Sequence, residues 1–194
     1  IVAKAVEIAS PLFEQRRHHL KLSVACKGLC VEGDPLRLAQ VIANLLTNAA
    51  KYTQPGGRIE VRAARAGSNV EILVRDNGIG IARELLPRIF DLFVQGERGR
   101  ARSEGGLGLG LALVRSLVEK HGGSVEARSG GSDRGSEFVV RLPAIDSPST
   151  NTQVGRTGEA LSTSHRSVLV VDDNEDAADL LAEILRIAGH RVDV

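Results

Sequence analysis

The chain has 194 residues, 42% of them hydrophobic and 25% charged, which is the composition of an ordinary globular protein. Its 25 Lys and Arg residues nearly balance 24 Asp and Glu residues, so a net charge of +1 gives no sign of a nucleic-acid partner. No apolar run approaches the roughly 18 residues that span a bilayer, and no signal peptide is visible. We therefore expect a cytoplasmic location without direct membrane contact. The chain lacks methionine, even at position 1, so we expect it to be part of a longer protein.

Apolar patterning divides the chain into three regions. Residues 1–143 are dense in periodic apolar residues and predict one complete domain. Residues 144–166 are rich in Ser, Thr and Gly and have no sustained period, which is typical of a flexible linker. From Ser167 the pattern resumes with VLVV, then DDNE, then a helix-like stretch to Ala188. Residues 167–194 are thus expected to begin a second domain. Cys26 and Cys30 lack the neighbours of a metal site and are expected to be reduced thiols.

The first half of the domain alternates between helical and strand-like patterns. A helix is predicted over residues 2–17, bent at Pro11, and strands over residues 20–24 and 30–32. Asp34 followed by Pro35 is a strong helix start, with the carboxylate at the N-cap. This helix is predicted to end near Tyr52, before a Pro-Gly-Gly turn.

The second half predicts two hairpins separated by helical segments. Strands are expected over residues 58–64 and 70–75, and again over residues 124–128 and 137–142. Helical patterns cover residues 82–92 and 107–121, the latter closed by Gly122-Gly123. The predicted strands can form one sheet, and the predicted helices suffice to cover one face of it. This predicts an α/β fold, a two-layer α/β sandwich.

Polar residues on the long predicted helix form a stripe of their own. Asn44, Asn48, Lys51 and Tyr52 fall at i, i+4, i+7 and i+8, on a different face from the apolar residues. An amide oxygen suits Mg²⁺, Lys51 suits phosphate, and Tyr52 suits a purine ring. A plain solvated face would give the same pattern, so this helix alone leaves both interpretations open.

The segment DNGIGI, residues 76–81, follows an alternating strand. An ionised Asp76 accepts hydrogen bonds only, which fits the exocyclic amino group of adenine. Gly78 and Gly80 let the backbone approach a flat ring. Asn-Gly is also a common hairpin turn, but a helical pattern follows it here instead of a returning strand.

The segment GGLGLGLALV, residues 105–114, puts glycines at 105, 106, 108 and 110 around a helix start. Free N–H groups and the helix dipole at such an end suit an anion. The chain has no GxxxxGK[ST], which excludes a P-loop, and the glycines do not follow a first strand as in a Rossmann unit.

NLLTNAAKYT (44–53), DNGIGI, IFDLFVQ (89–95) and GGLGLGLALVRSLVEKHGG (105–123) together resemble the N, G1, F and G2 boxes of sensor histidine kinases, in order and spacing. The resemblance implies the Bergerat ATP-binding fold, an ATP lid at residues 95–105, and catalytic roles for Lys51 and for Asn48 as the Mg²⁺ ligand. Leu107 stands where many relatives have Ser or Thr. The implied ATP contacts are Asn44, Asn48, Lys51, Tyr52, Asp76, Gly78, Gly80, Ile81, Gly106, Leu107, Gly108, Leu109 and Gly110.

The tail resembles the opening of a flavodoxin-like response-regulator receiver domain. Asp172 and Asp173 follow an apolar strand and would form a paired-carboxylate Mg²⁺ site, although an acidic helix cap gives the same pattern. The strand of the phosphoacceptor aspartate is absent from this sequence.

The two resemblances together imply the ATP-binding part of a hybrid sensor histidine kinase. The γ-phosphoryl of ATP would pass to a histidine on an upstream dimerisation domain, then to a receiver aspartate in cis or on a response regulator. His18 and His19 do not lie in the expected phosphoacceptor context. Two alternatives are another Bergerat ATPase and a non-catalytic nucleotide-binding module. The first would carry an activating Glu on the Asn-bearing helix, where this chain has Gln40 and Asn44.

Overall fold

A computed structural model describes residues 1–94, 108–145, 167–169 and 191–193 of the chain. The chain divides into two compact units, residues 1–149 and residues 150–194, and each is described by itself. Among the described residues, no helix is both long enough and apolar enough to cross a bilayer.

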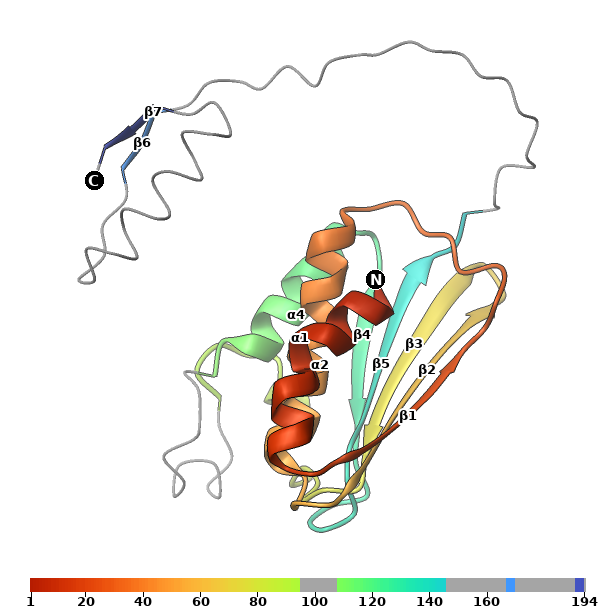
Figure 1. The fold of residues 1–194 in the computed structure, drawn as a ribbon, viewed down its shortest axis with the longest axis vertical. Coiled ribbons are helices and arrows are strands. Elements are labelled where there is room, and N and C mark those ends of the chain that lie inside the picture. The colour runs from red at the N-terminus through yellow and green to blue at the C-terminus, as the bar shows by residue number, and fades with distance from the viewer. Residues whose placement is uncertain (95–107, 146–166, 170–190, 194) are drawn as a thin grey trace. The chain divides into compact units, whose positions relative to one another are not determined.

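The first unit is built on a five-stranded sheet in the order β1-β2-β3-β5-β4 (Figure 1). β1 runs parallel to β2, and the other neighbouring strands are antiparallel. Helices cover one face of this sheet, which confirms the expected two-layer α/β arrangement. The strands are β1 (His19–Val24), β2 (Arg58–Ala66), β3 (Asn69–Asp76), β4 (Ser124–Arg128) and β5 (Glu137–Pro143). The helices are α1 (Val2–Gln15), α2 (Pro35–Tyr52) and α4 (Gly110–Lys120).

The core lies between the helices and the sheet. α2 has nine buried residues, against three each in α1 and α4, because apolar residues recur at helical spacing along its whole length. Alternate residues of β2, β3 and β5 face it, so one side of each strand is apolar. The buried strand residues on this side are Ile59, Val61, Ala63, Val70, Ile72, Val74, Phe138, Val140 and Leu142.

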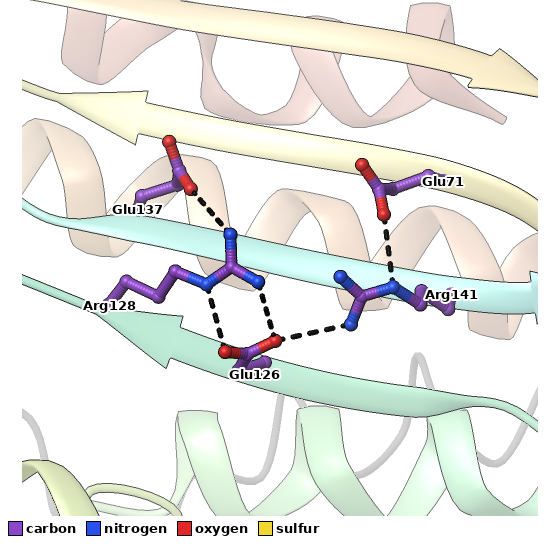
Figure 2. A network of polar contacts seen from close by, with 5 residues as sticks. All are labelled: Glu71, Glu126, Arg128, Glu137 and Arg141. Atoms are coloured by element: carbon purple, nitrogen blue, oxygen red, sulfur yellow. Dashed lines mark hydrogen bonds and ion pairs between the residues drawn. The ribbon is translucent and has the colours of Figure 1, made fainter. Parts of the chain in front are cut away.

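The other face of the sheet carries a network of ion pairs (Figure 2). Glu126 accepts from Nε and Nη2 of Arg128 at 2.8 and 2.9 Å and from Nη1 of Arg141 at 3.2 Å. Arg141 also binds Glu71 at 3.0 Å, and Arg128 lies 3.5 Å from Glu137. The hydrogen bonds from Arg128 and Arg141 hold the pKa of Glu126 below its ordinary value of 4.5. The side chains of these pairs are partly exposed, which identifies this face of the sheet as the solvated one. Exposed ion pairs of this kind add little stability.

The start of α2 and the end of α4 have the caps that the sequence predicts. Oδ1 of Asp34 accepts from the N–H groups of Leu36 and Arg37 at 2.8 and 3.1 Å and begins α2. At the end of α4, the N–H of Gly123 donates to the Val118 carbonyl at 3.0 Å, and Gly122 has φ +70°. This is the Schellman arrangement, which requires the glycine.

Three predicted elements differ from the structure. Residues 30–32 form no strand but a single bridge between Val31 and Ala144, because the N-cap at Asp34 follows at once. Residues 82–92 form turns and one 3₁₀ helix, η1 (Leu86–Arg88), since Pro87 lacks an N–H and disfavours α-helical geometry in the residue before it. α4 begins at Gly110 instead of residue 107, and Gly108 has φ +73°, which no α-helix contains.

The second unit contains a short parallel pair, β6 (Ser167–Leu169) and β7 (Arg191–Asp193). Parallel neighbours need a crossover of a dozen or more residues, and the 21 residues from 170 to 190 separate these two strands.

Candidate functional site

The polar stripe of α2 is partly accessible to solvent. Asn44, Asn48 and Lys51 are half-buried, and Tyr52 is 40% exposed at the end of the helix. Within the described part of the chain, no hydrogen bond engages the side chains of Asn44, Asn48 or Lys51. Half-buried amides without partners are costly unless a ligand or water completes them. The stripe therefore has free amide oxygens of the kind that Mg²⁺ accepts.

The position of α4 relative to this stripe follows from its packing on α2. α4 packs against α2, and its C-terminal end meets the N-terminal end of α2, because Asp34 N–H donates to Nε2 of His121 at 3.1 Å. The two helices are therefore antiparallel. At ~1.5 Å per residue, the 11 residues of α4 extend about 16 Å, the length of α2 from Pro35 to Leu45. Measured along α2, the start of α4 therefore falls at about the level of Asn44.

The N-terminus of α4 is free of side-chain caps. The first N–H groups of a helix have no intrahelical partner, and the N-cap residue here, Leu109, has no side-chain oxygen to accept from them. A Cβ at Gly110 would meet nothing within 4 Å, whereas one at Gly108 would lie 3.0 Å from the Phe93 backbone. The helix start can therefore accept an anion. The predicted contacts Gly106 and Leu107 and the predicted lid at residues 95–105 lie outside the described residues.

Asp76 ends β3 and is 7% exposed, so it is one of the few buried charged residues in the described parts of the chain. Its Oδ1 accepts from Gly78 N–H at 2.8 Å and from Ser136 N–H at 3.3 Å. Its Oδ2 accepts from the Ser136 hydroxyl. These donors fix the orientation of the carboxylate and leave part of its acceptor capacity unused.

The loop after Asp76 is held by the protein's own backbone. A Cβ on Gly78 would lie 2.3 Å from the Tyr52 carbonyl oxygen, and one on Gly80 would lie 2.1 Å from the Gly131 oxygen. Ile79 N–H donates to that Tyr52 oxygen at 3.0 Å. The expectation that these glycines make room for a ring is therefore incomplete, because neighbouring chain segments already fill the space. The same contacts bring the loop against the end of α2.

Ser129 and Ser136 belong to the site, although the sequence analysis did not select them. The Ser129 hydroxyl accepts from Ile81 N–H at 3.0 Å and donates to the Gly135 carbonyl at 2.7 Å. Thus the turn between β4 and β5 supports the segment around Asp76. Ser136 lies in the segment GSEFVVRLP, residues 135–143, but nothing local in that segment indicates a partner 60 positions earlier.

A shallow polar hollow adjoins Asp76 on the side away from the helices. No residue of α2 or α4 lines it, so it is distinct from the space between the stripe and the start of α4. Its lining consists of Arg75, Asp76, Arg128, Ser129, Gly130, Arg134, Gly135, Ser136 and Glu137.

The structure brings two predicted motifs together, the end of α2 and the loop after β3, and it packs α4, which follows the third motif's glycines, against α2. Among the described residues, no group of three or more His, Cys, Asp and Glu side chains could hold a metal by itself. Mg²⁺ typically binds through one or two protein oxygens plus substrate phosphates, so the amide of Asn48 fits such an ion without a cluster. Asp172 and Asp173, the second predicted metal site, lie outside the described residues.

Residues 33–146 match the family model described as histidine kinase-, DNA gyrase B- and HSP90-like ATPase. The chain is 38% identical over 187 residues to the sensor histidine kinase AtsR of Burkholderia thailandensis, covering 92% of this chain and 31% of AtsR. It is 36% identical over 162 residues to the circadian input-output histidine kinase CikA of Synechococcus elongatus, covering 82% of this chain and 21% of CikA. It thus spans less than a third of the length of these relatives.

Solved structures agree in fold. A mycobacterial sensor histidine kinase, MprB, matches with a TM-score of 0.65 at 28% identity, covering 75% of this chain and 97% of that one. Full-length ShkA in complex with AMPPNP matches with a TM-score of 0.63 at 25% identity, covering 98% of this chain and 38% of that one.

Proposed function

The chain belongs to the histidine kinase-, DNA gyrase B- and HSP90-like ATPase family, and we propose that residues 1–143 bind ATP with Mg²⁺ as the catalytic part of a hybrid sensor histidine kinase. Three observations support this proposal: Asp76 is buried and oriented, the polar stripe of α2 has no side-chain partners, and α4, which packs on α2, begins without a cap. The similarity to ShkA, whose structure is described with AMPPNP, supports a nucleotide ligand.

Each part of the site has one role in this proposal. Asp76 accepts a hydrogen bond from the amino group of adenine, while Tyr52 covers the ring. Lys51 and the first N–H groups of α4 hold the phosphates, so Gly108, Leu109 and Gly110 form the phosphate end. Asn48 supplies an oxygen to the metal, with Asn44 beside it. A Mg²⁺ ion held there would supply charge neutralisation to the phosphates.

The reaction is proposed to be phosphoryl transfer to histidine. The bond between the γ-phosphorus and the bridging oxygen breaks, a nitrogen–phosphorus bond forms on the acceptor, and ADP leaves. Positioning and electrostatics dominate such transfers. Lys51 and the α4 start, which carry positive charge or dipole, would stabilise the charge that develops on the leaving ADP.

The acceptor histidine is proposed to arrive on a separate dimerisation domain. An exposed apolar patch stands at the α4 start, where such a domain could reach the γ-phosphate. It consists of Leu92, Phe93, Leu109 and Leu113, of which Phe93 is 67% and Leu92 61% exposed. Phe93 N–H donates to the Gly108 carbonyl at 3.2 Å and so holds the two halves of the patch together. Large exposed apolar side chains in one place favour an interface.

Residues 167–194 are proposed to begin a receiver domain after a linker at residues 144–166. The parallel pairing of β6 and β7 across 21 residues fits the first crossover of a doubly wound sheet. In this proposal Asp172 and Asp173 bind the Mg²⁺ of the receiver, and the phosphoryl group passes from histidine to an aspartate of that domain or of a response regulator.

Base selection tests the nucleotide proposal directly. Calorimetric titration should give saturable binding of ATP and at most weak binding of GTP, whose carbonyl cannot donate to Asp76. Asp76→Asn keeps the size of the side chain but removes the charge, so ATP binding should lose about 1.5–3 kcal/mol. Equal affinity of the parent for ATP and GTP, or unchanged ATP affinity in the variant, would contradict the assignment of Asp76.

A further inference from the structure

We propose that His121 is a positioning residue for the nucleotide site, fixing the placement of α4 relative to α2 from the end of the helix pair remote from the phosphates. The inference deepens the proposed function, on which it rests, because it concerns the same site. His121 is the C-cap residue of α4 and lies beside the N-cap of α2.

Both nitrogens of the His121 ring are engaged. Nε2 accepts from the Asp34 N–H at 3.1 Å, and Nδ1 lies 2.7 Å from the Leu117 carbonyl oxygen. A backbone N–H only donates and a carbonyl only accepts, so the ring is neutral and carries its proton on Nδ1. One nitrogen therefore binds within α4, and the other binds across to α2.

The ring has little freedom to move. A Cβ on Gly33 would lie 2.4 Å from Cδ2 and 3.0 Å from Nε2 of His121, so the ring packs directly on the Gly33 backbone. Gly123 N–H closes the helix end on the Val118 carbonyl at 3.0 Å and fixes the backbone from which the ring extends. The imidazole is thus held between the two helix ends.

Asp34 transmits this constraint to α2. Its N–H binds His121, while its carboxylate accepts from the Leu36 and Arg37 N–H groups in the first turn of α2. One residue therefore couples the end of α4 to the beginning of α2. Because the helices are antiparallel, a change of angle at this end moves their opposite ends apart or together. Those ends carry Asn48 on one side and Gly110 on the other.

The constraint should affect the binding of the phosphates and not the binding of the base. A triphosphate with its metal must contact α2 and the start of α4 at once, whereas the base is assigned to Asp76 on the sheet. Loosening the His121 contact should therefore weaken ATP binding and leave adenosine binding unchanged. A loss of global stability would affect both ligands alike.

Two amide variants separate the two hydrogen bonds of the ring. In His121→Gln, the side-chain oxygen can reach the place of Nε2 and keep an acceptor for Asp34. In His121→Asn, the side-chain NH₂ takes the place of Nδ1 and keeps the donor to Leu117, but nothing reaches Asp34. We expect ATP affinity to fall about tenfold in the Asn variant and by about threefold or less in the Gln variant, with adenosine affinity equal in all three proteins.

A third variant, Gly33→Ala, displaces the ring while leaving His121 in the sequence, and it should reproduce the selective loss of the Asn variant. Urea unfolding checks that each protein is folded at the titration temperature. ATP affinity that is unchanged in both His121→Asn and Gly33→Ala would overturn the inference, as would a parallel loss of ATP and adenosine binding. A parent that binds neither ligand would instead contradict the proposed function, and the inference with it.

Discussion

The Ser136 hydroxyl donates a hydrogen bond to Oδ2 of Asp76, joining the residue before β5 to the end of β3. Together with the N–H groups of Gly78 and Ser136 on Oδ1, it occupies three acceptor positions of the carboxylate. A carboxylate offers about four such positions. One remains for a ligand donor, and its direction is set before any ligand arrives.

Ser136→Ala should therefore weaken adenine binding without touching the ligand-facing part of Asp76. Loss of the hydroxyl frees Oδ2 and lets the carboxylate turn, so we expect ATP affinity to fall by about 1 kcal/mol. Ser136→Thr keeps the hydroxyl and serves as the matched control. Calorimetric titration of the three proteins checks this, and an Ala variant that binds ATP as tightly as the parent would show that Ser136 does not orient Asp76.

The contrast between Asp76 and Ser136 illustrates what could be predicted from the sequence. Asp76 stands at the end of an alternating strand within a recognisable motif, and α2 has a clear start at Asp34 and a clear polar stripe. Ser136 acquires its role only when β5 pairs with β3, since 60 residues separate it from Asp76. Strand pairing across such distances has no local signal.

Some elements differ from the sequence prediction because of single residues and distant contacts. The periodicity of residues 82–92 is helical, yet Pro87 limits that segment to turns and η1, a signal that was present in the sequence and outweighed the apolar spacing. Likewise, the sequence predicts that glycine is needed at positions 78 and 80. It does not predict the reason, which is that the backbones of Tyr52 and Gly131 lie where a Cβ would be.

Asn48→Ala should reduce the dependence of ATP binding on Mg²⁺. In the parent, the amide oxygen gives the metal a protein ligand, so ATP should bind more tightly with Mg²⁺ than in the presence of a chelator. The variant should lose most of this difference. Thr47→Ala, at a half-buried neighbouring position of α2, provides the control. If the parent bound ATP equally tightly with and without Mg²⁺, the assignment of Asn48 as a metal ligand would be wrong.

Asp34 should make stability depend on pH in the acid range. Hydrogen bonds from the Arg37 and Leu36 N–H groups hold the pKa of Asp34 below its ordinary value of 3.8. A lowered folded-state pKa stabilises the protein above the unfolded-state pKa, and this contribution disappears as pH falls through the folded-state value. Asp34→Asn cannot titrate. Urea unfolding should show a stability difference between parent and variant that is constant above about pH 5 and shrinks below the ordinary pKa.

A stability difference that stays constant between neutral pH and about pH 2 would contradict this assignment, because the N-cap carboxylate would then not be the titrating group. The comparison separates Asp34 from the other carboxylates, which are common to both proteins.

Phosphoryl transfer to a supplied histidine domain tests the central claim most directly. His18 is a poor internal acceptor, because its Nδ1 is buried and its Nε2 lies 2.9 Å from the Ala50 carbonyl oxygen. Incubation of the chain with γ-labelled ATP and Mg²⁺ should therefore leave it unlabelled. Addition of a dimerisation domain bearing the acceptor histidine, taken from a related kinase, should give acid-labile label on that domain, and the label should be lost with Asp76→Asn. Label on His18 or His19 of the chain itself, or none on any supplied histidine domain despite ATP binding, would contradict the account.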